Sequence, residues 1–206
     1  MQSIANTDQR RARSERTREK LLDAAMLCYK DRGINNTAMD NVAQQAGVGR
    51  ATLYRHFNNQ EALLTEVMTR NVQELQHILK SALSNCETPE DYYVEATLVI
   101  IRECRQRSLI GLLFGDDSST SVISRISFSD KNILAMGTDL ISPFYKRAKA
   151  EGVLRQWVTK PLLQEWTSRL LLSFLTNPSP HLSSEKEMRQ FLYQAVIPSI
   201  IDRPAA

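Results

Sequence analysis

The sequence predicts an all-α protein with a small N-terminal helical domain followed by a larger helical domain. Apolar residues recur at the 3.6-residue spacing of helices over most of the 206 residues, and no segment shows the two-residue alternation of a strand. Ser, Thr, Asn or Pro stands where most of these segments begin, and Gly or Pro follows where they end. We expect an arm at residues 1–15, one domain at 16–60 and another at 61–206.

The positive charge of the chain is concentrated near its N-terminal end. The net charge is only +3, but residues 1–57 hold 10 basic and 6 acidic residues, a net charge of +4. A largely basic run from Arg10 to Lys20 is typical of a segment that lies along a polyanion, and a solvated tail is the alternative. No stretch approaches 18 consecutive apolar residues, so we expect a cytoplasmic protein without contact with a membrane.

The first helix is expected over residues 16–32, ending near Gly33. Apolar residues repeat on one face at positions 21, 24, 25, 28 and 29, which would back the motif that follows. Arg16 and Arg18 begin this helix, and we expect both to contact a polyanion.

A helix-turn-helix motif is predicted between Thr37 and Glu61. Met39, Val42, Ala43 and Ala46 share one helical face, and Thr37 with Asp40 has the spacing of a capping box. Gly47 suits the tight turn, and Gly49 precedes a second helix. In that helix Leu53 and Phe57 can face the core, while the groups that bind phosphates and base edges face outward: Arg50, Thr52, Tyr54, Arg55 and His56. An ordinary pair of core helices is the alternative.

The stretch AGVGRATLYRHFNNQEALL, and more broadly residues 16–64, resembles the DNA-binding domain of the TetR/AcrR family of bacterial regulators. The resemblance implies that residues 50–57 enter the major groove of DNA, with Tyr54 and His56 mainly on phosphates. It also implies that Thr37 holds the DNA backbone beside the groove. Gln60 stands where the family commonly has Lys, and Gly49 where it has Ser, so Gln60 would be a weaker, neutral phosphate donor.

Five further helices are expected at residues 60–83, 89–107, 130–150, 161–176 and 184–197. Pro143 should kink the third of these or split it in two. The helix Pro161–Thr176 is apolar nearly all round, and Ser184–Ile197 carries an apolar stripe after a Ser184/Glu187 capping box. These two helices would leave an exposed apolar patch unless a second copy covered them, so we expect a homodimer through them, with a thick monomer core as the alternative.

These expectations describe a sequence-specific DNA-binding transcriptional regulator. The resemblance implies a repressor that binds a palindromic operator as a dimer and is released by a small hydrophobic or amphipathic effector bound in the C-terminal domain. Cavity candidates include Phe114, Phe128, Phe144, Trp157 and Trp166, although such residues more often form core. No HExxH, GxSxG, phosphate loop or paired Cys motif is present, so no catalytic, cofactor or metal site is expected. Alternatives are a regulator without ligand control and a dimeric helical interaction protein.

Overall fold

The computed structural model describes residues 2–106, 131–177 and 179–203. Over this part of the chain the regular elements are helices. One isolated antiparallel bridge pairs Leu154 with Ile201. The all-α fold class predicted from the sequence is confirmed. The chain divides into two compact units, residues 1–71 and 72–206. No helix of the described residues is long and apolar enough to cross a membrane.

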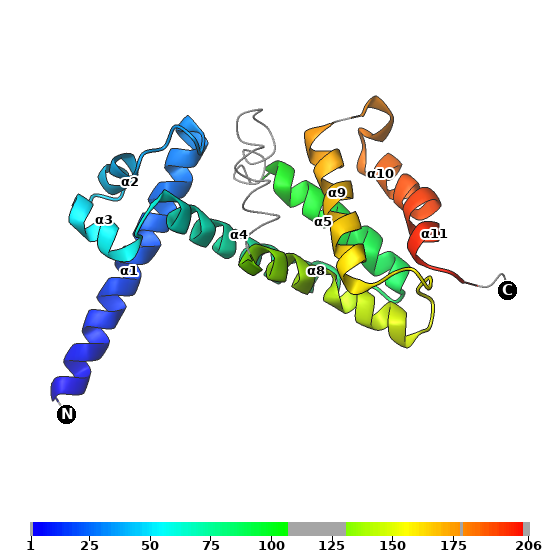
Figure 1. The fold of residues 1–206 in the computed structure, drawn as a ribbon, viewed down its shortest axis with the longest axis horizontal. Helices are drawn as coiled ribbons and strands as arrows, with labels where there is room; N and C mark the ends of the chain where they lie inside the picture. The colour runs from blue at the N-terminus through cyan, green and yellow to red at the C-terminus, as the bar shows by residue number, and fades with distance from the viewer. Residues whose placement is uncertain (1, 107–130, 178, 204–206) are drawn as a thin grey trace. The chain divides into compact units, whose positions relative to one another are not determined.

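The N-terminal unit consists of α1 (Gln2–Arg32), α2 (Met39–Gln45), α3 (Arg50–His56) and the first turns of α4 (Gln60–Ala82) (Figure 1). Each helix contributes one apolar face to a shared core, which removes those faces from water. The core contains Leu21, Leu22, Ala25, Tyr29, Ile34, Met39, Val42, Ala43, Leu53, Phe57, Leu63, Leu64, Val67 and Met68. The last four of these residues belong to α4, so the unit extends into this helix, to residue 71. The domain boundary predicted from the sequence lies after residue 60.

Two helix starts in this unit differ from the sequence prediction. Helix α1 begins at Gln2 rather than at residue 16, since residues 2–15 contain no Gly or Pro to interrupt it. Helix α2 is capped at Ala38, whose backbone N–H donates to Oδ1 of Asn41 at 3.0 Å. The capping box predicted from Thr37 and Asp40 is therefore wrong, because Thr37 is buried one residue before the cap.

The C-terminal unit is built around α5 (Pro89–Gln106), α8 (Lys131–Ala150) and α9 (Lys160–Thr176), which pack against one another. The rest of α4 packs on α5 through a separate cluster of Leu75, Leu79, Leu83 and Val99. Helix α8 contains Pro143 without a break, so the predicted split does not occur. The main core of the unit includes Tyr93, Val94, Leu98, Ile101, Phe144, Leu163, Phe174, Met188, Leu192, Val196 and Ile200.

The last helical segment continues past Pro198, although the sequence predicts that it ends near this residue. After a short 3₁₀ turn (Pro180–Leu182), it comprises α10 (Glu185–Phe191), a π-helical turn η2 (Leu192–Val196) and α11 (Ile197–Ile200). The predicted Ser184/Glu187 capping box is present at its start. The N–H of Ile197 donates to the carbonyl of Leu192, five residues back, and this wider turn accommodates Pro198, which has no N–H to donate.

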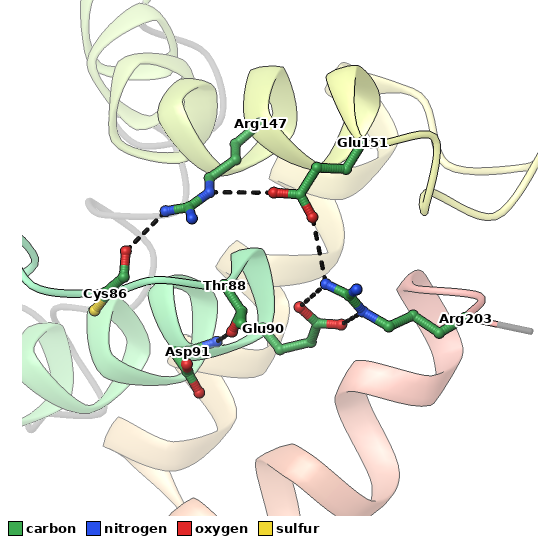
Figure 2. A network of polar contacts seen from close by, with 7 residues as sticks. All are labelled: Cys86, Thr88, Glu90, Asp91, Arg147, Glu151 and Arg203. Carbon is green, nitrogen blue, oxygen red and sulfur yellow. Dashed lines mark hydrogen bonds and ion pairs between the residues drawn. The ribbon is translucent and has the colours of Figure 1, made fainter. Parts of the chain in front are cut away.

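A polar network ties the C-terminal end of the chain to α5 and α8 (Figure 2). Nη1 of Arg147 donates to the carbonyl of Cys86 at 2.7 Å, and its Nε donates to Glu151 at 3.3 Å. Arg203 donates to Glu151 at 3.3 Å and also pairs with Glu90. Hydrogen bonding from Arg203 lowers the pKa of Glu90, so the carboxylate stays charged in the folded protein. The network thus joins the loop after α4, the start of α5, the end of α8 and the chain end.

Candidate DNA-binding site

The turn between α2 and α3 has the geometry that a helix-turn-helix requires. Gly47 adopts a φ of 64°, a left-handed conformation that a residue with Cβ rarely takes. Its N–H donates to the carbonyl of Gln44 at 3.1 Å, and the N–H of Val48 donates to that of Ala43 at 3.0 Å. These two bonds are a Schellman motif, which ends α2 and reverses the chain. The role predicted for Gly47 is confirmed.

Helix α3 is fixed by its inner face and presents its outer face to solvent. Leu53 and Phe57 are almost completely buried, as predicted. Arg50, Tyr54 and Arg55 are exposed, whereas Thr52 is half-buried at the flank of the helix. The exposed side chains supply two guanidinium groups and a phenol, which hydrogen-bond to phosphates and base edges.

Arg50 is oriented by two neighbours. Its Nη1 donates to Oδ2 of Asp40, in the first turn of α2, at 3.1 Å. Its guanidinium carbon lies 5.5 Å from the ring centre of Tyr54, one turn further along α3, which is a cation–π distance. No functional role is predicted for Asp40 from the sequence, because a single carboxylate in the first turn of a helix is common and carries no specific signal.

Two residues expected to contact the DNA backbone instead hold the loop between α1 and α2. Thr37 is 2% exposed, and its hydroxyl lies 2.8 Å from the carbonyl oxygen of Gly33 and 3.1 Å from that of Cys28. Nε2 of Gln60 donates to the carbonyls of Ile34, at 3.0 Å, and Thr37, at 2.9 Å. Both amide N–H groups of Gln60 are therefore engaged inside the unit, which differs from the phosphate contact expected from the resemblance.

Arg16 and Arg18 lie in different environments although only one residue, Thr17, separates them. Arg16 is exposed and forms no ion pair with the described residues. Arg18 pairs through Nε and Nη2 with both carboxylate oxygens of Glu66 on α4, and its guanidinium lies 5.3 Å from the ring centre of Phe57. Arg18 thus connects α1 to α4 and covers the end of α3. Of these two arginines, Arg16 has the guanidinium that is free for a phosphate.

His56 is also turned partly into the unit. Its Nε2 is buried and makes no hydrogen bond to any residue that the structure describes. Burial lowers the pKa of His56, and the nearby charges of Arg55 and Arg18 lower it further. The imidazole is therefore neutral at pH 7, so any phosphate contact that it makes is a hydrogen bond without a full positive charge.

Residues 21–67, which contain this motif, match the family described as bacterial regulatory proteins, tetR family. In these residues the chain resembles the TetR family of bacterial regulatory proteins. The match covers the core of the N-terminal unit from Leu21 to Val67, and so includes all of α2 and α3.

Similar proteins extend the comparison beyond this motif. The chain is 25% identical to an uncharacterized HTH-type transcriptional regulator of Mycobacterium tuberculosis, over 98% of this chain and 95% of that protein. It is 35% identical over 98 residues to the HTH-type transcriptional activator FasR of Mycolicibacterium smegmatis, covering 40% of this chain and 44% of FasR. The fold resembles that of the fatty acid degradation regulator FadR from Bacillus halodurans, with a TM-score of 0.69 and 16% identity over 87% of this chain and 95% of that one. Over nearly its whole length the chain is therefore similar to an HTH-type transcriptional regulator.

Proposed function

We propose that this chain is a regulator of the TetR family, which binds a near-palindromic operator as a homodimer, represses transcription there and is released by a small hydrophobic or amphipathic effector. The observation that carries the proposal is the outer face of α3, where Arg50, Tyr54 and Arg55 project from a helix anchored by Leu53 and Phe57. Such a face can enter a major groove without rearrangement of the core. Arg16, with its free guanidinium, is the best candidate for a phosphate contact beside it.

The exposed apolar face of α9 supports the dimer. Leu162 and Trp166 lie one turn apart on α9 and are 44% and 39% exposed, while Leu163 and Phe174, on the adjoining face of the helix, are buried in the core. Trp157, just before the helix, is also exposed. A second copy that covers this face would remove large apolar groups from water. Two α3 helices about 34 Å apart would then read half-sites one turn of DNA apart.

Control by an effector follows from the family rather than from a cavity seen among the described residues. Among the cavity candidates, Phe144 is part of the core, Trp157 and Trp166 are exposed, and Phe114 and Phe128 lie outside the described residues. An effector that binds the DNA-free form more tightly must weaken DNA binding, and DNA must weaken effector binding by the same factor. A thermal-shift screen in which only highly charged, sugar-like compounds stabilise the protein would rule out an apolar effector. The proposed setting for this control is the bacterial cytoplasm.

The test measures binding of the full chain to its own upstream DNA over a series of salt concentrations. The variant Arg50→Ala with Tyr54→Ala removes the cation–π pair on α3. Its matched control is Lys149→Ala, because Lys149 forms the same kind of pair with Tyr145 on α8, at 5.9 Å. We expect tight binding to a palindrome that weakens steeply with salt, is lost in the α3 variant and is retained in the control.

Equal binding by the α3 variant and the control would refute the DNA-reading role of α3. The sign of regulation needs a reporter gene placed behind the bound promoter, since FasR, a relative, is an activator. Lower reporter output in the presence of the protein supports repression, and higher output would replace it with activation. Weak binding to all sequences would favour the interaction-protein alternative.

A further inference from the structure

The side chains of Asp40, Arg50 and Tyr54 form a small polar surface that joins α2 to α3. Arg50 is the first residue of α3. Its guanidinium donates a hydrogen bond to Asp40 and lies at a cation–π distance from the ring of Tyr54. Asp40 accepts from one of the five N–H groups of Arg50, and within the described part of the chain no other hydrogen bond engages this guanidinium. The remaining N–H groups are free to donate to a ligand.

This arrangement adds little to the stability of the fold. The side chain of Arg50 is 67% exposed and that of Asp40 is 58% exposed, and ion pairs so open to water are weak. Its main physical consequence is orientation, because a guanidinium held on a carboxylate and above an aromatic ring samples fewer rotamers than a free one. A donor that is oriented before binding loses less conformational entropy when it meets its acceptor.

The chemistry of Asp40 also selects the kind of acceptor that Arg50 can approach. A phosphate brought to Arg50 would come close to the carboxylate of Asp40, and two negative charges in proximity repel each other. The O6 and N7 atoms of guanine are neutral acceptors that suit two parallel N–H donors of an arginine. The carboxylate therefore disfavours a backbone contact by Arg50 more than it disfavours a base contact.

We propose that Asp40 is a specificity-determining residue, which directs Arg50 to the edge of a guanine in the operator and away from the phosphate backbone. The proposal rests on the proposed DNA-binding function and assigns one base contact within it. Asp40 acts through Arg50 and is a positioning residue, while Arg50 makes the contact with the base.

The test selects binding sequences from a random duplex library with the full chain, its Arg50→Ala variant and its Asp40→Asn variant. We expect the wild-type motif to contain a guanine whose preference disappears in Arg50→Ala and falls about tenfold in Asp40→Asn. Asp40→Asn should also bind an unrelated duplex more tightly than wild type, because the variant removes a negative charge from the DNA-facing surface. A loss of folding would weaken both kinds of binding, so this opposite change separates a positioning role from a structural one.

The matched control is Asp31→Asn. Asp31 also pairs with an arginine, Arg32, at 3.4 Å on the exposed side of α1, so the control removes the same charge from the same unit. It should leave the guanine preference unchanged. The inference is overturned if Asp40→Asn keeps the full preference, or if Arg50→Ala weakens binding to all sequences equally with a smaller salt dependence, as a phosphate ligand would. A wild-type protein that selects no motif would refute the proposed function itself, an outcome distinct from both.

Discussion

Replacing Arg18 with alanine should destabilise the N-terminal unit without removing a phosphate contact. Arg18 donates two charge-assisted hydrogen bonds to Glu66, and the side chains are 36% and 28% exposed. Such bonds contribute roughly 1.5–3 kcal/mol when shielded, and the exposure of this pair calls for the lower part of that range. The contact with the Phe57 ring adds about 0.5 kcal/mol. We expect Arg18→Ala to lower the free energy of unfolding by about 2 kcal/mol.

Two assays on the same protein separate this role from DNA contact. Urea unfolding followed by far-UV circular dichroism gives the loss of stability, and Glu66→Gln should reproduce most of it by breaking the pair from the other side. The slope of the logarithm of DNA affinity against the logarithm of salt concentration counts phosphate contacts, at about 0.9 per contact. Arg16→Ala should reduce this slope by about 1.8 in a dimer, since each copy loses one contact. Arg18→Ala should leave the slope unchanged.

Exchanged outcomes for Arg16 and Arg18 would refute these two roles. An Arg18→Ala protein with wild-type unfolding and a slope reduced by about 1.8 would show that Arg18 leaves Glu66 to bind a phosphate. An unchanged slope in Arg16→Ala would show that exposure on α1 is not sufficient for contact with DNA.

Two further outcomes test the loop and the dimer. Gln60→Ala should lower the free energy of unfolding by about 1–3 kcal/mol, because two hydrogen bonds to backbone carbonyls are lost. The exposed Gln73 on the same helix provides the control Gln73→Ala, and equal losses in urea unfolding would contradict the role of Gln60. Trp166→Glu should convert the dimer to a monomer in sedimentation experiments, since it places a charge in the middle of the α9 face. A Trp166→Glu protein that remains dimeric would assign the interface to another surface.

The positions of the helices followed from local chemistry and were predictable for that reason. The spacing of apolar residues in α2 and α3, the positive φ of Gly47 and the Ser184/Glu187 box all act within a few residues of chain. Helix starts were less certain where several caps compete. Asn41 replaced the predicted Thr37/Asp40 box at α2, and no Gly or Pro stopped α1 short of Gln2.

The roles of polar side chains depended on partners that are distant in the sequence. Glu66 lies 48 residues from Arg18, and the carbonyl of Ile34 lies 26 residues from Gln60, so no spacing rule connects them. From the sequence, Arg18 and Gln60 are predicted to contact DNA. The sequence near the motif does not distinguish a donor that is free from one that is hydrogen-bonded inside the protein. Their internal contacts appear only once α1 and α4 are packed together.

The sequence by itself determined the all-α class and the helix-turn-helix, because periodicity, caps and turn glycines are local properties of the chain. The same local stretch carries the resemblance to the TetR family. The tertiary structure decided which donors near the motif remain without a partner inside the unit. Arg16 and Arg18 have the same chemistry and lie two residues apart, but the packing of α1 on α4 pairs one guanidinium with Glu66 and leaves the other in solvent. Similarly, Asp40 lies beside Arg50 because the turn at Gly47 brings the start of α2 close to the start of α3.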